Sequence, residues 1–292
     1  MPSPQGFPYG PARGILMGLG LVAAPAGAIF RGVMRTAEVL RSVEVRWQID
    51  FDALSDEELL AMGRAGHEVL DVHRVLTKTN DNVVGEILRD QGTFYEWDHF
   101  PKGDVYDRET HGQYYYHAHP LDQRFEGEHG HFHTFMRPKG MPPWVKPATV
   151  PRYKAPKDPN DQLSHLIGIS MDPRGFAFRL FTVNRWVTGE VWYDAANVAT
   201  LLDYFKIDHA RPSWPVNRWI TAIVRLYKPL IVELVKVRDQ TVEAWHRAHP
   251  EVEDVFEDRN LEVTSYADIS AESQIRAVGQ AIEARGLVLQ QA

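Results

Sequence analysis

Apolar residues recur at helical spacing in several stretches of the chain, and these stretches predict the helices. Ser55 and Glu58 form a capping box, in which the serine caps the helix start and the glutamate reaches back to the cap. Apolar positions from Leu59 to Leu76 then follow three or four residues apart, which predicts a helix over 56–77. Further helices are expected over 31–45, 82–90, 194–205, 215–248 with a kink at Pro229, and 271–285.

From residue 93 onward, aromatic and β-branched residues are separated by turn residues, which is typical of strands. Pro-Lys-Gly-Asp at 101–104 indicates a turn. Strands are expected over 113–119, 129–136, 163–171, 176–187 and 190–193, and another near 260–266. Because helices precede and follow this region, we predict an α+β fold, with an antiparallel sheet of about five strands (residues ~113–193) packed against N- and C-terminal helices.

The length of 292 residues is compatible with a single globular domain over 1–292. Two segments within it have a distinct composition. Residues 137–160 are rich in proline and basic residues, so we expect an extended strap over one face of the sheet, or alternatively a lid or an anion-binding arm. Residues 1–30 are apolar and rich in glycine and proline.

The apolar run in the N-terminal segment, ILMGLGLVAAPAGA, is too short to cross a bilayer. One interpretation is an export signal over residues 1–28, which would place the protein in the periplasm. The interpretation that we favour is a cytoplasmic protein, in which residues 15–30 pack on the body or contact a membrane or a protein partner.

The composition excludes several classes of function. A net charge of −7 and a pI near 6.0, without a long basic run, argue against a nucleic-acid partner. The chain has no cysteine, which excludes thiolate catalysis, disulfides and cysteine-ligated metals. It also lacks a glycine-rich phosphate loop, a G-x-S-x-G elbow and an H-E-x-x-H motif.

Five of the thirteen histidines lie within residues 117–133, in the segment HAHPLDQRFEGEHGHFH. Residues two apart on a strand share a face, so His117 and His119 point the same way on one strand, as do the three histidines of the next. If the two strands pair around the loop 120–128, Tyr115 lies opposite His133, His117 opposite His131, and His119 opposite His129. A slip of one residue would separate the two sets.

Such a cluster predicts a transition-metal site, because neutral imidazole is a good ligand for iron, copper and zinc. The candidate ligands are His117, His119, His129, His131 and His133. Tyr115 would lie on the same face and is a candidate catalytic residue, whose phenol could contact a metal-bound molecule. Glu128 in the loop is a candidate base beside such a molecule, as is Glu126. The alternatives are a solvent-facing polar strand whose histidines pair with nearby acids, and a pH-sensing patch.

Two more histidines have possible roles at such a site. His165 lies among apolar residues in LSHLIGISM, where it is either a hydrogen-bonded core residue or a supporting residue of the cluster. His99 could form a carboxylate–histidine pair with Glu96 or Asp98.

The favoured hypothesis for the function is a non-haem metal-dependent enzyme that acts on a small apolar or aromatic molecule, with an oxidoreductase favoured over a hydrolase. One alternative is a non-catalytic metal or haem carrier, or a structural metal site. Another is a scaffold protein that docks on a partner or membrane through its N-terminal segment.

Overall fold

The computed structural model describes residues 42–151 and 153–289, and within them it has seven α-helices and seven strands. The helices are α1 (Asp56–Thr77), α2 (Val83–Leu88), α3 (Arg185–Thr188), α4 (Ala195–Leu201), α5 (Trp214–Leu226), α6 (Lys228–Ala248) and α7 (Ala271–Ala284). The strands are β1 (Val43–Glu44), β2 (Phe100–Tyr106), β3 (Gly112–His117), β4 (Gly130–Met136), β5 (Ser164–Met171), β6 (Ala177–Val183) and β7 (Val263–Asp268).

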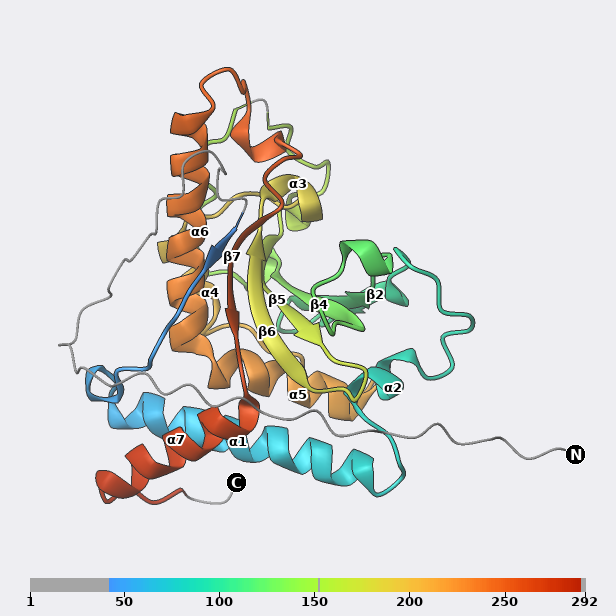
Figure 1. Ribbon diagram of the computed structural model, residues 1–292, viewed down its shortest axis with the longest axis vertical. Coiled ribbons are helices and arrows are strands. Elements are labelled where there is room, and N and C mark those ends of the chain that lie inside the picture. The colour runs from blue at the N-terminus through green and yellow to red at the C-terminus, as the bar shows by residue number, and fades with distance from the viewer. Residues whose placement is uncertain (1–41, 152, 290–292) are drawn as a thin grey trace, which may run out of the picture. The chain divides into compact units, whose positions relative to one another are not determined.

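The fold is α+β, as predicted, but the prediction of about five antiparallel strands was wrong. The seven strands form one mixed sheet in the order β1-β7-β6-β5-β4-β3-β2 (Figure 1). The short strand β1 runs parallel to β7, and the other neighbours are antiparallel. Strand β7, which follows the long helices in the sequence, therefore returns to the sheet beside β6.

Three local differences have identifiable causes. The predicted turn at 101–104 lies inside β2, where Gly103 and Asp104 have positive φ and the register with β3 shifts, so this edge strand carries an irregularity instead of a turn. The predicted strand 176–187 ends at Val183, because Asn184 caps the short helix α3. Residues 190–193 form no strand. The apolar residue Trp192 of this segment is buried in a small second core, where Trp245 also lies.

Helix α1 begins where the capping box predicts. The Ser55 hydroxyl accepts a hydrogen bond from the Glu58 backbone N–H, and the Glu58 carboxylate accepts one from the Ser55 backbone N–H. The predicted helix 215–248 is two helices, which meet at Tyr227, with Pro229 in the first turn of α6. That position suits proline, because the first helical turn needs no N–H donor from it.

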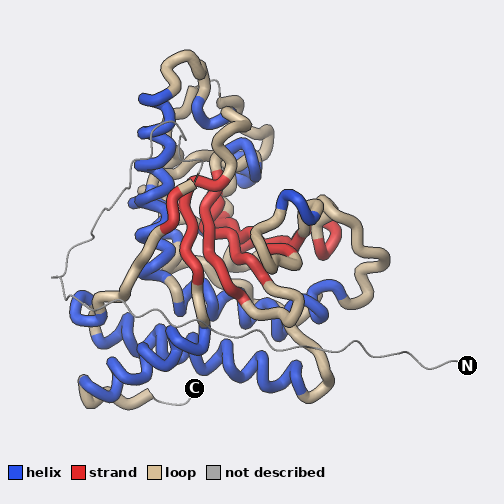
Figure 2. Tube along the Cα trace, in the orientation of Figure 1, coloured by secondary structure: helices blue, strands red, loops and turns tan. Residues whose placement is uncertain are grey.

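Helices cover one face of the central sheet. Tyr114 of β3 donates a hydrogen bond of 2.6 Å to Asn217 of α5, and Phe132 of β4 contacts Trp219 of the same helix. Helix α6 runs beside β6 and β7, and α1 lies along α5 and α7 (Figures 1 and 2). Even-numbered residues of β3 and β4 therefore face the helical layer, and odd-numbered residues face the opposite side of the sheet.

The strap over 137–160 is extended apart from two short 3-10 turns, Pro138–Gly140 and Pro159–Asp161, in its described residues. It is fastened to the body, since the Arg137 guanidinium donates to the side-chain oxygen of Gln113 in β3 and the Ala148 backbone N–H donates to the carbonyl of Trp192. The apolar segment 1–30 and residues 31–41 of the predicted helix 31–45 lie outside the described residues, and Val43–Glu44, near the end of that predicted helix, form β1 instead. In the described part of the chain, no helix combines the length and hydropathy that a membrane crossing requires.

Candidate metal centre

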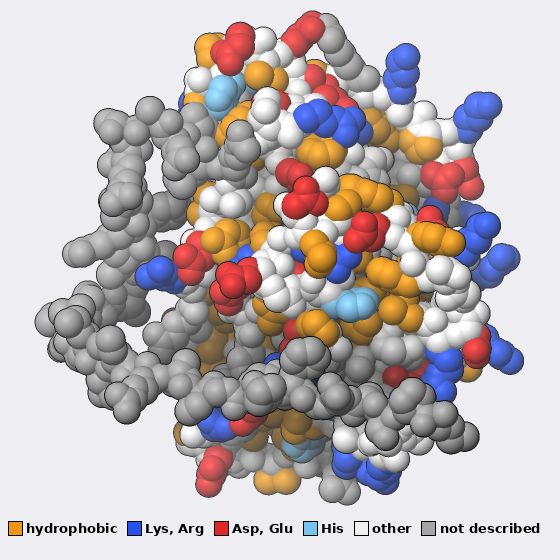
Figure 3. Space-filling model, turned by 45° about the vertical axis from the view of Figure 1, so that its right-hand side comes forward, with side chains coloured by type: hydrophobic (Ala, Val, Ile, Leu, Met, Phe, Trp, Pro, Cys, Tyr) orange, Lys and Arg blue, Asp and Glu red, His pale blue; other side chains and the backbone are white. Residues whose placement is uncertain are grey.

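Strands β3 and β4 pair in the register that the metal hypothesis requires and that the sequence left open. Tyr115 lies opposite His133 and His117 opposite His131. The alternation of a β-strand then places all four side chains on the face of the sheet that the helices leave free. Few histidine side chains among the described residues reach the surface drawn in Figure 3, because those of the cluster are buried.

His117, His131 and His133 form a compact triad. Their ligand atoms all lie within 4.8 Å of one another, and the Nε2 atoms of His117 and His131 are 2.7 Å apart. Two nitrogens bound to one tetrahedral ion lie roughly 3.3 Å apart, for metal–nitrogen distances of about 2.0–2.1 Å. Small rotations of the rings would therefore bring three imidazole nitrogens to an ion, so these residues fit a transition metal.

Glu128 is hydrogen-bonded to Nδ1 of His131, the ring nitrogen opposite the one that faces His117. Its Oε1 atom lies 3.1 Å from Nδ1 of His131, and both side chains are buried. Burial acts to raise the pKa of Glu128, but the hydrogen bond and proximity of His131, together with the nearby Ser170 hydroxyl and a hydrogen bond from the Phe125 backbone N–H, outweigh it and keep the pKa below its usual value. A carboxylate on the outer nitrogen of a histidine leaves the other nitrogen for a metal. Glu128 is thus placed to orient His131 and is not the free base that the sequence suggested.

The histidines at the two ends of the predicted cluster differ. The His119 ring stacks on Trp97, and its centroid lies 4.9 Å from that of His117 and 5.1 Å from that of His131. His119 therefore borders the triad. The Nδ1 atom of His129, in contrast, lies 2.6 Å from the hydroxyl of Tyr116, which belongs to the helical face.

The expectation that His129 shares the face of the other four is wrong. Strand β4 begins only at Gly130, so residue 129 precedes the paired segment and does not follow its alternation. The pairing of His119 with His129 does not form, because β3 ends at His117 and β4 begins at Gly130.

Tyr115 lies beside the triad and is stacked on a further histidine. The Tyr115 and His99 rings are parallel, with centroids 3.7 Å apart, and the Tyr115 ring also neighbours His117 and His133. Burial, and then the nearby carboxylates of Asp104 and Glu190, raise the pKa of the Tyr115 phenol, so it stays protonated at neutral pH.

His99 forms a carboxylate–histidine pair, but with a partner that the sequence did not suggest. Its Nδ1 atom lies 2.9 Å from Asp104 of β2, and neither Glu96 nor Asp98 takes that position. The pairing depends on the irregular backbone of β2, which no local sequence signal revealed. His165 of β5 also contacts the cluster, since its Nε2 atom lies 2.9 Å from Nδ1 of His133.

His117, His119 and His133 are held neutral at neutral pH. Burial is the main cause and the neighbouring imidazoles the second, and together they lower the pKa of His119 to about 4 and that of His117 and His133 further. A neutral imidazole has one nitrogen with a free lone pair, which is the form that binds a metal. Metal binding here would therefore require little proton release near neutral pH.

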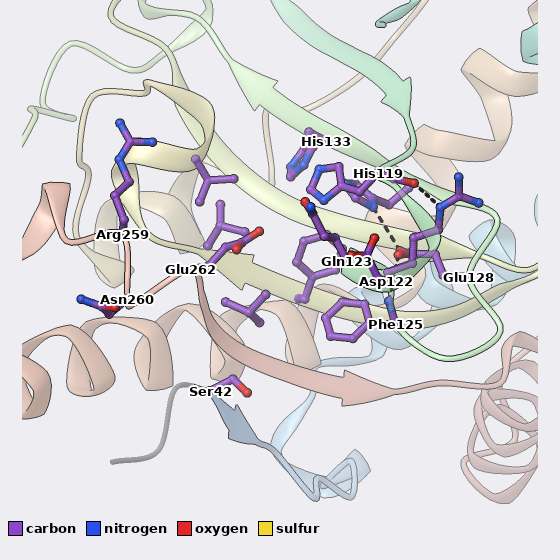
Figure 4. A pocket seen from close by; sticks show the side chains of 16 residues that line it. Ser42, His119, Asp122, Gln123, Phe125, Glu128, His133, Arg259, Asn260 and Glu262 are labelled. Carbon is purple, nitrogen blue, oxygen red and sulfur yellow. Dashed lines mark hydrogen bonds and ion pairs between the residues drawn. The ribbon is translucent and has the colours of Figure 1, made fainter. Parts of the chain in front are cut away.

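A pocket of about 390 Å³ opens onto the triad. His119, His131 and His133 line one end, Phe125 and Phe181 belong to its walls, and Figure 4 shows polar side chains around the rest. The volume suits a small organic molecule, and the mixture of apolar walls with a few polar groups is typical of ligand sites.

Glu262, which the sequence analysis did not single out, projects into this pocket (Figure 4). Its backbone carbonyl accepts a hydrogen bond from Asn184, and its carboxylate has no hydrogen-bond or ion-pair partner among the described residues. Desolvation raises the pKa of Glu262, and the proximity of His131 acts in the opposite sense. Its relation to the histidines arises from β7 returning beside β6, which a local pattern does not reveal.

Comparisons with known proteins give one result. No curated protein and no solved structure matches the chain. A protein-family profile matches residues 63–269, a span that contains the triad, His99, His165 and Glu262. The profile covers well over half of the chain, and the chain therefore belongs to this family, which is described as a domain of unknown function (DUF6969).

Proposed function

We propose that the protein binds one transition-metal ion through His117, His131 and His133 and acts as a metal-dependent enzyme. The observation that carries the proposal is the convergence of three buried imidazoles, whose ligand atoms lie within 4.8 Å of one another, at the end of a pocket that His131 and His133 line. Buried polar groups in a native structure need partners, and an ion would satisfy all three nitrogens at once.

An all-imidazole donor set, in a chain without cysteine, suits iron, copper or zinc. When bound, such an ion would supply Lewis-acid or redox chemistry to a molecule in the pocket. Among these possibilities we favour an oxidoreductase. Aromatic rings surround the triad, and hydrolysis would need a free carboxylate base beside a bound water. Among the described residues, the carboxylate bonded to a triad histidine is Glu128, and its hydrogen bond with His131 leaves it unsuited to that role.

The pocket supports a small apolar or aromatic substrate. Phe125 and Phe181 provide flat apolar surface, and the Phe181 ring packs edge-on against His131. A substrate that lies on these rings would be held next to the triad. Glu262 is a pocket carboxylate without a hydrogen-bond or ion-pair partner among the described residues, and is placed to accept or return a proton from such a molecule.

His119 favours a second candidate function. Its ring is close enough to His117 and His131 to move onto the same ion, which would complete a four-imidazole shell. A closed shell is typical of structural or carrier sites, whereas three protein ligands and an open position are typical of catalytic sites. The visible absorption spectrum of the Co²⁺-loaded protein distinguishes them, since His119→Ala changes it only in the closed form.

The test of the proposal is the metal content of purified protein and of three single variants. We expect about one ion per chain in the wild type and strong depletion in His117→Ala and His131→Ala, because each removes a ligand. His129→Ala is the matched control, because this histidine lies in the same segment but faces the other way. Metal-free wild-type protein that also fails to take up Zn²⁺, Co²⁺ or Cu²⁺ would refute the proposal.

A further inference from the structure

His133 and His165 form a hydrogen-bonded pair of histidines beneath the triad. The Nδ1 atom of His133 lies 2.9 Å from Nε2 of His165, and each residue is 1% exposed. A neutral imidazole carries one N–H and one bare nitrogen. The pair therefore has two possible arrangements, which differ in which ring donates the proton between them.

Only one arrangement leaves His133 able to bind an ion in the triad. If Nδ1 of His133 carries the proton and donates it to His165, then Nε2 of His133 is bare. If His165 donates instead, the single proton of neutral His133 is on Nε2, and that nitrogen has no free lone pair. The metal-binding state thus requires His165 to act as the acceptor.

The geometry around His165 suits the acceptor role. The residue is 1% exposed, and its Nε2 atom faces Nδ1 of His133 at 2.9 Å, a hydrogen-bonding distance. A neutral ring at this place can accept the Nδ1 proton of His133.

The backbone of β5 is also fixed at this point. The Glu190 carboxylate accepts a hydrogen bond from the backbone N–H of His165, and both residues are buried. The position of His165 is therefore fixed by its strand and by Glu190, and the residue does not line the pocket.

We propose that His165 is a positioning residue of the metal centre, which accepts the Nδ1 proton of His133 and thereby presents Nε2 of His133 to the ion. This inference rests on the proposed metal site. It gives the two neighbouring ligands different supports: His131 is held by a carboxylate and His133 by a neutral imidazole. A carboxylate makes its histidine the more basic ligand, so the two bonds to the ion would differ in strength.

The test measures the affinity for Zn²⁺ by competition with a chelator, and the absorption spectrum with Co²⁺. His165→Leu keeps an apolar side chain but removes the acceptor, and we expect the affinity to fall about 10- to 100-fold with a changed Co²⁺ spectrum. His165→Gln offers a side-chain oxygen near the place of Nε2 and should restore most of the affinity. His73→Leu, a largely buried histidine on α1 that bonds to Trp219, is the matched control and should bind like the wild type.

A second measurement uses the wild type alone, in case His165→Leu does not fold. Nitrogen-15 NMR of the Zn²⁺-loaded protein should show His133 protonated at Nδ1 and metal-bound at Nε2. Wild-type protein that binds no metal in the competition assay would overturn both the proposed function and this inference. Wild-type protein that binds metal, with His133 ligated through Nδ1 or with unchanged affinity in His165→Leu, would overturn this inference alone.

Discussion

Lowering the pH from about 7 to about 5 should destabilise the metal-free protein strongly, because its buried histidines cannot take up protons without unfolding. The unfolded chain protonates histidine near the reference pKa of 6.5. In the folded protein the pKa of His119 is about 4 and that of His165 about 3, and burial lowers those of His117 and His133 as well. The stability that these groups contribute is thus present above pH 6.5 and is lost as the pH falls.

The magnitude follows from proton linkage. A histidine that is protonated only in the unfolded state lowers the free energy of unfolding by about 2 kcal/mol over this interval, so four of them lower it by about 7–8 kcal/mol. Glu190 acts in the opposite sense, because burial raises its pKa from 4.5 to about 8. The stability that Glu190 contributes is present at low pH and lost as the pH rises. Acidification from pH 7 to pH 5 therefore raises the free energy of unfolding by about 2–3 kcal/mol through this residue. The net loss is about 5 kcal/mol, comparable with the whole stability of many domains.

Urea unfolding of chelator-treated protein, followed by circular dichroism at both pH values, measures this loss. Glu190→Gln removes the ionisable group, so it should raise the free energy of unfolding by about 3 kcal/mol near pH 7, where unfolding releases the glutamate proton, and by only about 1 kcal/mol near pH 5. The acid loss should therefore grow by about 2–3 kcal/mol. A loss below about 1 kcal/mol in the wild type would refute the reasoning. It would mean that the rings titrate as they do in water and that the cluster is solvated.

Three further substitutions test the fold around the site. Ser55→Ala removes the cap of α1 and should lower the free energy of unfolding by about 1 kcal/mol in urea denaturation; an unchanged midpoint would contradict the role of the capping box. Trp219→Ala empties a fully buried position on the helical face and should cost about 3–5 kcal/mol, yet leave the Zn²⁺ stoichiometry of the folded protein unchanged; a metal-free but folded variant would contradict the separation of the two faces. Gly168→Ala would place a methyl group against the Phe181 ring that packs on His131 and His133, so its Co²⁺ spectrum should differ from that of the wild type; an identical spectrum would show that this ring does not shape the site.

Local patterns predicted the elements whose cause is local. The capping box at Ser55 places the start of α1, because both of its hydrogen bonds join residues three apart. The two-residue alternation of histidines predicted that those of one strand share a face, because side chains two apart on a strand point the same way. The pairing of His117 with His131, on which the metal hypothesis depends, also requires one register of β3 with β4, which the loop 120–128 left open and the structure fixes.

The parts that sequence patterns missed have three different causes. Strand β7 joins the sheet beside β6 after about eighty intervening residues, and only this long-range pairing brings Glu262 to the pocket. His99 meets Asp104, five residues away, through an irregularity in β2 that resembles a turn in sequence. His129 faces away from the triad because the alternation was extended one residue beyond the start of β4.

The most direct test of the central claim is X-ray absorption spectroscopy of the Zn²⁺-loaded protein, which counts the ligands around the ion and identifies imidazole by its scattering. We predict at least three imidazole nitrogens at about 2.0–2.1 Å, and one fewer in His133→Ala. A first shell made only of oxygen, or one with the same number of imidazoles in His133→Ala as in the wild type, would contradict a metal centre built on His117, His131 and His133.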